Sequence, residues 1–297
     1  MEPSLTMSRA VSASRSPGQY LASSSAPVAI GGLGGSGTRV VAQLLKELGF
    51  FLGADLNESL DNLWFTFLFK RPAILTADPA EVEVLIEAFT QRMSSEQRLP
   101  ESVTACVKQL ILEDRSPEFT KDWSEHRAAS LLQESPVTCK TPWGWKEPNT
   151  HLLILPLKRV VPSLKYVHVT RNGLDLAFSA NQNQLRLWGP HIIGPACEVS
   201  PFYALRYWRM VEERVESIAD QLGPDFLLLN FDKLCVTPEP ELSRLLDFVG
   251  ISATVDQRRQ LLCSLRKPPT LGRFRDHDLG QFDPEDFAFA LEHSYFP

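Results

Sequence analysis

The sequence predicts an α/β fold in which one parallel sheet is covered by helices on both faces. Two observations carry this prediction. Short apolar runs alternate along the chain with segments of helical period, and the first run leads through a glycine-rich turn into a helical segment. Alternation of strands and helices is typical of a parallel sheet that helices cover on both faces. With 297 residues, 43% of them hydrophobic, the chain can bury a substantial core, and we expect a single domain over residues 27–297.

The first predicted strand and helix flank a cluster of glycines. Residues 28–33 form an apolar run that ends in glycine, and residues 40–48 repeat their apolar side chains at helical spacing until Gly49. A second helix is predicted over residues 79–93, because Asp78 supplies an N-cap and Pro79 occupies the first helical position.

Later segments repeat the alternation of strand and helix. Residues 164–170 are rich in β-branched and aromatic side chains and predict a strand, and a helix should begin at Leu174 and include residue 179. Residues 203–222 predict a long amphipathic helix closed by Gly223, followed by an apolar run over 226–231. These units indicate further parallel strands of the same sheet.

Residues 1–26 differ in composition from the rest of the chain. They are rich in Ser and Ala, contain Glu2 as their one acid, and lack apolar periodicity, so we expect a disordered tail. The same composition, with Arg9 and Arg15, leaves an organelle transit peptide as an open alternative.

Charge and cysteine usage exclude several classes of function. The net charge of −6 and the pI near 5.6 argue against a nucleic-acid binder, which needs a broad excess of Lys and Arg. Five scattered cysteines without a CxxC pair suggest neither a disulfide framework nor a zinc site, so we expect a reducing, cytoplasmic location. No stretch approaches the roughly 20 apolar residues that span a bilayer.

The glycine cluster predicts a phosphate-binding turn between the first strand and the first helix. Successive N–H groups of such a loop can converge on one anion, and the helix dipole and two hydroxyls add to the attraction. A simple tight turn remains an alternative. The Gly-Lys-Ser/Thr order of an ATP-binding P-loop is absent, because Ser36 stands where the lysine would be. The residues concerned are Gly34, Gly35, Ser36, Gly37, Thr38 and Arg39.

A second constellation follows the 164–170 strand. Arg171 ends that strand and Ser179 lies further along, so both can face the carboxyl edge of the sheet, where ligands of doubly wound folds bind. An arginine fork together with a hydroxyl suits a phosphate monoester, whereas a lone arginine in this position is often a solvated loop residue.

Together these segments resemble the sulfotransferase superfamily, which uses 3′-phosphoadenosine 5′-phosphosulfate (PAPS). The family pairs a Ser-Gly-Thr loop for the 5′-phosphosulfate with an arginine turn and a later serine for the 3′-phosphate. The likeness extends over residues 28–278, because 226–250 resembles the strand and helix that follow and 266–275 resembles a basic loop that closes over the nucleotide. The resemblance implies a P-loop-like fold. It also implies that the nucleotide is contacted by Arg171, Ser179, Phe231, Arg266, Lys267 and Arg273.

The run Gly144-Trp145-Lys146-Glu147-Pro148 resembles a segment of the tyrosylprotein and carbohydrate branch of this superfamily. By that resemblance Lys146 contacts the sulfuryl or bridging oxygen. Gly35 stands where the family usually has Lys or Arg, so Arg39 or Lys146 must compensate. The resemblance also implies that Asp55 is the general base, although Asp55 could instead cap the helix that follows it. Glu58 and Glu147 are the other candidates for the base.

The predicted function is transfer of a sulfuryl group from PAPS to a hydroxyl or amine, with no metal required. The acceptor could be a small molecule, a carbohydrate or a peptide, and the sequence indicates neither its identity nor the oligomeric state. A P-loop nucleotide kinase and a sulfotransferase-like binding protein without activity are the alternatives, the second because of Gly35.

Overall fold

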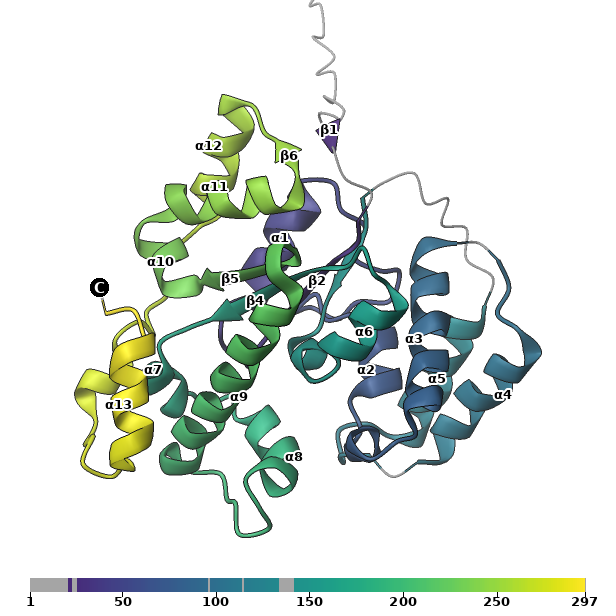
Figure 1. Ribbon diagram of the computed structural model, residues 1–297, viewed down its shortest axis with the longest axis horizontal. Coiled ribbons are helices and arrows are strands. Elements are labelled where there is room, and N and C mark those ends of the chain that lie inside the picture. The colour runs from purple at the N-terminus through teal and green to yellow at the C-terminus, as the bar shows by residue number, and fades with distance from the viewer. Residues whose placement is uncertain (1–20, 23–25, 96, 114, 134–141, 297) are drawn as a thin grey trace, which may run out of the picture.

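The computed structural model describes residues 21–22, 26–95, 97–113, 115–133 and 142–296. Its central sheet has four parallel strands in the order β3-β2-β4-β5, which confirms the predicted fold class (Figure 1). The bounds of these strands are Val28–Gly32 for β2, Gly144–Lys146 for β3, Lys165–Thr170 for β4 and Phe226–Asn230 for β5.

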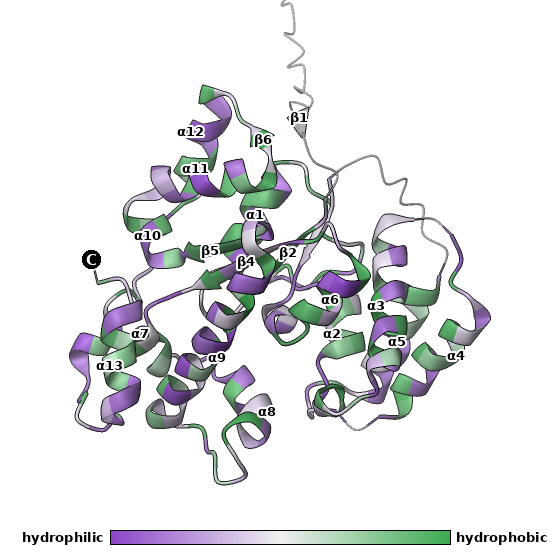
Figure 2. Cartoon of the chain, viewed as in Figure 1, coloured by the Kyte–Doolittle hydropathy of each residue, from purple (hydrophilic) through white to green (hydrophobic). Residues whose placement is uncertain are grey.

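Helices cover both faces of the sheet, and alternate strand residues enter two separate apolar cores. On one face Ile30 and Val167 pack with α1 (Thr38–Glu47), α11 (Pro238–Val249) and α12 (Val255–Ser264). On the other face Ala29, Trp145 and Tyr166 join a larger core with α6 (Ile154–Val160), α7 (Gly173–Ala177), α8 (Asn183–Ile192) and α9 (Pro201–Leu222). The helices around the sheet carry both hydrophobic and hydrophilic residues, as expected for helices with one buried face (Figure 2).

Four helices form a group to one side of the sheet, beyond the edge strand β3 (Figure 1). They are α2 (Leu63–Phe69), α3 (Pro79–Ser94), α4 (Glu101–Gln109) and α5 (Lys121–Leu132). Inside the group the buried Arg71 pairs with Glu81 and Glu113. This helical group contributes aromatic side chains to the larger core, including Phe65 and Phe89 around Trp145.

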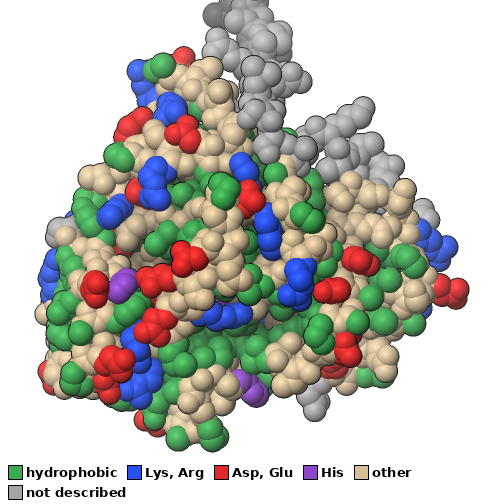
Figure 3. Space-filling model, viewed as in Figure 1, with side chains coloured by type: hydrophobic (Ala, Val, Ile, Leu, Met, Phe, Trp, Pro, Cys, Tyr) green, Lys and Arg blue, Asp and Glu red, His purple; other side chains and the backbone are tan. Residues whose placement is uncertain are grey.

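The remaining α-helices lie to the left of the sheet in Figure 1, and the remaining strands lie above it. They are α10 (Phe231–Val236), α13 (Pro284–His293) and the two-residue strands β1 (Leu21–Ala22) and β6 (Ile251–Ser252), which pair antiparallel. Basic and acidic side chains are interspersed over the face shown in Figure 3. In the described part of the chain, no helix combines the length and apolar character needed to cross a membrane.

Most predicted elements are confirmed, with shifts at their ends. The helix predicted over 79–93 is α3, and the one predicted over 203–222 is α9. Two expectations need correction. Helix α7 ends at Ala177, so Ser179 follows the helix instead of lying within it, and Phe231 opens α10 instead of closing β5. Of the tail predicted over 1–26, Leu21 and Ala22 form β1, while residues 1–20 and 23–25 lie outside the described residues.

Candidate functional site

A cleft of about 360 Å³ opens at the carboxyl ends of the central strands. A volume of this size suits a cofactor-sized ligand. The cleft brings together the glycine loop after β2, the end of β3 and the end of β4. Its lining residues are Gly34, Gly35, Gly37, Thr38, Arg39, Val40, Ser59, Asp61, Lys146, Pro148, Arg171, Asn181, Phe231 and Pro268. Three cations and one carboxylate thus face a common space.

The glycine loop depends on backbone conformations that favour glycine. Gly35 and Gly37 have φ of 89° and 93°, and a Cβ on Gly37 would lie 2.1 Å from Cδ2 of Phe231. The loop leads into the N-terminus of α1, where first-turn amides have no intrahelical carbonyl to bind. The Ser36 hydroxyl is buried and has no hydrogen-bond partner in the described structure. This arrangement can hold an anion at the helix N-terminus.

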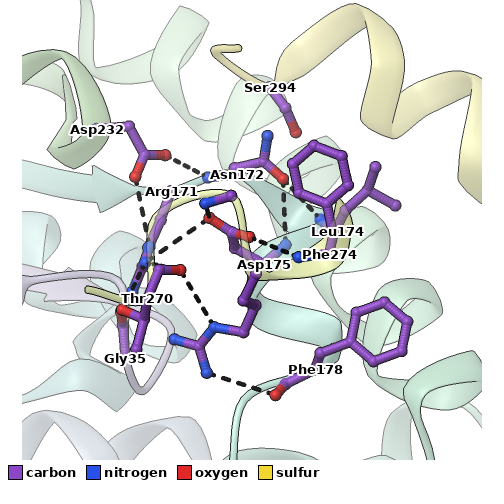
Figure 4. A network of polar contacts seen from close by, with 12 residues as sticks. Gly35, Arg171, Asn172, Leu174, Asp175, Phe178, Asp232, Thr270, Phe274 and Ser294 are labelled. Atoms are coloured by element: carbon purple, nitrogen blue, oxygen red, sulfur yellow. Dashed lines mark hydrogen bonds and ion pairs between the residues drawn. The ribbon is translucent and has the colours of Figure 1, made fainter. Parts of the chain in front are cut away.

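Arg171 is held in one wall of the cleft by carbonyls and carboxylates (Figure 4). Its guanidinium donates to the backbone oxygens of Gly35 at 3.2 Å and Thr270 at 2.9 Å. Nε lies 3.4 Å from Asp232, and Nη2 lies 3.7 Å from Asp175. Burial raises the pKa of Asp232, although its hydrogen bond from the Asn172 amide and the charge of Arg171 oppose this shift. The two carboxylates therefore fix the orientation of an almost fully buried cation.

Asp175 also binds the segment that follows α12 and so links it to the polar contacts around Arg171. Its carboxylate accepts hydrogen bonds from the backbone N–H of Gly272 at 2.7 Å and of Phe274 at 3.2 Å (Figure 4). In that segment Arg273 donates to the carbonyl of Thr270, and burial followed by the nearby charge of Arg171 lowers the pKa of Arg273. Arg171 and the predicted basic loop are thus parts of one network.

Lys146 forms an ion pair with Asp61 at the opposite wall of the cleft. The Lys146 side chain is 3% exposed, and Nζ donates to Asp61 Oδ1 and to the carbonyl of Ser59. The second Asp61 oxygen accepts from Asn57 at 2.8 Å. Among the described residues, Leu60 is the one non-glycine residue with positive φ, at 62°. Backbone strain of this kind is concentrated at functional sites, and here it lies next to the carboxylate that faces Lys146.

The three predicted base candidates lie elsewhere. Asp55 forms a half-buried ion pair with Arg127 from α5, and Glu58 is exposed on the surface. Glu147 is 2% exposed and accepts hydrogen bonds from the amide and side chain of Asn149. In the described structure none of the three lines the cleft, whereas Asp61 does.

The structure places the other predicted residues as follows. Most of the glycine loop, Arg39, Lys146, Arg171 and Phe231 line the cleft. Ser179 lies behind Gly35, where its Oγ accepts from the Asn181 amide. Arg266 and Lys267 are exposed, and Arg266 donates to carbonyls of its own segment. The cleft lining identified from the described residues does not include them, Ser36, Ser179 or Arg273, so their roles as nucleotide contacts stay predictions.

Several residues of the site were missed in the sequence. Asp61 carries no motif, and its pairing with Lys146 joins positions 85 residues apart. Thr270 and Asn181 likewise reach the site through loops. Asp232 and Asp175 could have been found, because each follows a predicted strand end within a few residues, where polar side chains meet at one edge of a parallel sheet.

Comparison with known proteins identifies the chain at the family level. The family model described as "Sulfotransferase family" matches residues 27–255, which is more than half of the chain. No curated protein was found to match it.

Distant likenesses to solved structures were also found. The sulfotransferase domain of the Synechococcus PCC 7002 olefin synthase has a TM-score of 0.48 and 14% identity, over 91% of this chain and 95% of that one. Sulfotransferase STF1 from Mycobacterium tuberculosis H37Rv has a TM-score of 0.41 and 14% identity, over 80% and 71%. Retinol dehydratase, solved with retinol and PAP, has a TM-score of 0.43 and 14% identity, over 91% and 83%.

Proposed function

The chain belongs to the sulfotransferase family, and we propose that it transfers a sulfuryl group from PAPS, with the following roles for its own residues. The observation that carries the proposal is the cleft, where the glycine loop, Lys146 and Arg171 converge. The glycine loop and the N-terminus of α1 bind the 5′-phosphosulfate, and Arg171 binds the 3′-phosphate. Lys146 and Arg39 supply the positive charge that Gly35 lacks.

The residues of the cleft fit this ligand. Two guanidinium nitrogens of Arg171 donate hydrogen bonds to neutral backbone oxygens. A phosphate could take the place of these oxygens and accept stronger, charge-assisted hydrogen bonds. The buried Ser36 hydroxyl has no partner in the described structure, and a buried polar group without a partner is costly. Phe231 lies against Gly37, with the Arg171 guanidinium 5.7 Å from its ring centroid, so one aromatic face lies between the two phosphate-binding parts.

In the reaction, the acceptor oxygen or nitrogen attacks the sulfur atom while the bond from sulfur to the bridging oxygen breaks. The electron pair of that bond passes to the 5′-phosphate, and the acceptor loses its proton to a base. Negative charge therefore grows on the bridging oxygen, where a fixed cation stabilises the transition state more than the ground state. Lys146 has this role in our proposal, because the walls of the cleft hold it in place.

We assign the general base to Asp61 rather than to Asp55. Asp61 faces the cleft and its side chain is 20% exposed, whereas Asp55 is engaged with Arg127. Its Oδ2 bonds only to the exposed Asn57 among the described residues, so an acceptor hydroxyl can reach that oxygen. A base in this position contributes about 10²- to 10⁴-fold to the rate.

The matched pair Asp61→Asn and Asp55→Asn tests this assignment. Asp61→Asn should lose about 10²-fold or more of the turnover while keeping its affinity for the nucleotide. Asp55→Asn should keep its turnover and lose thermal stability, because Arg127 would be left without its carboxylate. The opposite pattern would return the role of base to Asp55.

Three finer statements are parts of the proposal. The Gly144–Pro148 segment supports placement in the tyrosylprotein and carbohydrate branch, with a small molecule, carbohydrate or peptide as acceptor. The four cysteines within the described residues are free, which supports a reducing, cytoplasmic compartment. Protein cations and backbone amides take the place of a metal at the phosphates.

Calorimetry with adenosine 3′,5′-bisphosphate in the presence of EDTA tests the core of the proposal. We expect binding without a metal, and much weaker binding of 5′-AMP, because Arg171 is assigned to the 3′-phosphate. Binding of Mg·ATP but not of the bisphosphate would refute the proposed site and favour a nucleotide kinase.

A further inference from the structure

A buried chain of hydrogen bonds runs beneath the cleft from Glu147 to the glycine loop. The Glu147 carboxylate accepts from the Asn149 amide at 2.6 Å and from Asn149 Nδ2 at 2.8 Å. Asn149 Oδ1 accepts from Gln184 Nε2 at 2.8 Å, and Gln184 Oε1 accepts from the amide of Gly34 at 2.6 Å. The three side chains are between 2% and 7% exposed, so water does not compete for these bonds.

The direction of every bond in this chain is fixed by its neighbours. Asn149 Oδ1 also accepts from Trp188 Nε1 at 2.7 Å, so this oxygen receives two N–H donors. Turning the Asn149 amide round would set its NH₂ group against both donors. Asn149 must therefore present Nδ2 to Glu147, which receives two N–H donors in turn. Two such donors favour the ionised carboxylate over the neutral acid.

Glu147 also responds to the charges of the cleft. Burial and the negative charge of Asp61 raise its pKa to about 7, whereas Lys70 beyond the end of α2 and the two bonds from Asn149 act in the opposite direction. Its sequence neighbour Lys146 belongs to β3 and pairs with Asp61. Of the charged groups near Glu147, Asp61 and Lys146 line the cleft, where they would meet the sulfonate and the acceptor.

We propose that Glu147 is a positioning residue whose protonation is coupled to occupancy of the cleft by the nucleotide, and that Asn149 and Gln184 connect it to the glycine loop. The inference rests on the proposed function, because it takes the cleft as the nucleotide site. An anion in the cleft adds negative charge near Glu147 and favours its neutral form. Glu147 therefore takes up a proton when the nucleotide binds at neutral pH, which relieves repulsion of the bound anion.

Once Glu147 has taken up the proton, it no longer repels the bound anion or the nearby carboxylate of Asp61. Gln184 accepts a hydrogen bond from the amide of Gly34, so this amide helps to fix the conformation of the glycine loop. Glu147 acts through Asp61 and through the loop, and it does not contact the cleft itself in the described structure.

Calorimetry in buffers of different ionisation enthalpy tests the coupling without knowledge of the acceptor. At pH 7 we expect the wild-type protein to take up more protons than Glu147→Gln when it binds adenosine 3′,5′-bisphosphate. The phosphates of the ligand contribute the same protonation to both proteins, so the difference reports on Glu147. Glu147→Asp keeps a carboxyl group and should keep the excess uptake, which also covers the case in which Glu147→Gln does not fold.

The variant Gln184→Leu tests the other end of the hydrogen-bond chain. We expect it to bind the bisphosphate about tenfold more weakly, the size of one lost hydrogen bond to the loop, while it retains the proton uptake of the wild type. Equal uptake by wild type and Glu147→Gln would overturn the inference. Failure of the wild-type protein to bind the bisphosphate would instead refute the proposed function, so the two failures are distinct.

Discussion

The two walls of the cleft are built in different ways. The wall that carries Arg171 is set by the ends of β4 and β5, where Asp175 and Asp232 hold the guanidinium within one network (Figure 4). The wall that carries Lys146 depends on a loop, in which Leu60 has a positive φ and Asp61 turns toward β3. The first wall is preorganised by buried charges, whereas the second stores backbone strain. Substitutions in the first should therefore affect binding and folding together, and those in the second should affect turnover.

The largest effect is expected for Arg171→Ala. It removes the cation between two buried carboxylates, and breaking a buried pair in this way costs about 3–5 kcal/mol of stability. We expect loss of bisphosphate binding by more than about 100-fold and a clear fall in the denaturation midpoint. Arg171→Lys should recover stability more than affinity, because a lysine lacks the guanidinium fork. Weaker binding with unchanged stability would show that the carboxylates do not depend on Arg171.

Lys146→Ala should behave in the opposite way at the other wall. We expect turnover to fall by about 10²- to 10³-fold, as for the loss of one donor that stabilises the transition state, with bisphosphate affinity nearly unchanged. Lys146→Met keeps most of the buried stem and controls for lost packing. If both variants turn over at the wild-type rate, Lys146 is a structural cation that serves only to pair with Asp61.

These two walls also differ in how far the sequence could predict them. The glycine loop and Arg171 were predicted because each directly follows a strand, and a parallel sheet brings strand ends to one edge. Asp61 was not predicted, since its place depends on a five-residue turn around Asn57 and on a contact over 85 residues with Lys146. Asp55 was preferred because the family resemblance implied it, but its ion pair joins it to α5, a helix whose packing no local pattern reveals.

Gly37→Ala tests how tightly the nucleotide wall is packed. The added Cβ would lie 2.1 Å from Phe231, at a φ of 93° that already costs an alanine about 1–2 kcal/mol. Gly194→Ala is the matched control, because Gly194 has a φ of 136° but a Cβ added there would meet no atom within 4 Å. We expect Gly37→Ala to be the less stable variant in denaturant unfolding and to lose bisphosphate affinity. Similar losses in both variants would mean that Phe231 moves aside freely.

The smallest expected effect is the pH dependence of stability, and it comes from two neighbours on the 3₁₀ helix Pro148–Leu152 and its N-cap. Burial holds the pKa of His151 well below 6.5, and neither ring nitrogen has a partner in the described structure. The unfolded chain therefore binds a proton at His151 more readily than the folded protein does. The contribution of His151 to stability is complete above pH 6.5 and is lost as the pH falls below it. Burial raises the pKa of Glu147 from 4.5 to about 7, so the folded state binds that proton more readily.

The Glu147 contribution has the opposite sign. It is complete below pH 4.5 and is lost as the pH rises toward 7, so the two groups oppose each other between about pH 4.5 and 6.5. Single variants should separate them when unfolding free energies are measured across this range. His151→Phe should make stability fall more steeply as the pH rises, because the effects of Glu147 and of Asp232, whose pKa burial also raises, are then not opposed by His151. Glu147→Gln should make stability rise with pH, by at most about 1.4 kcal/mol per pH unit, the limit for one proton. Parallel curves for the wild type and both variants would show that neither group changes its proton affinity on folding.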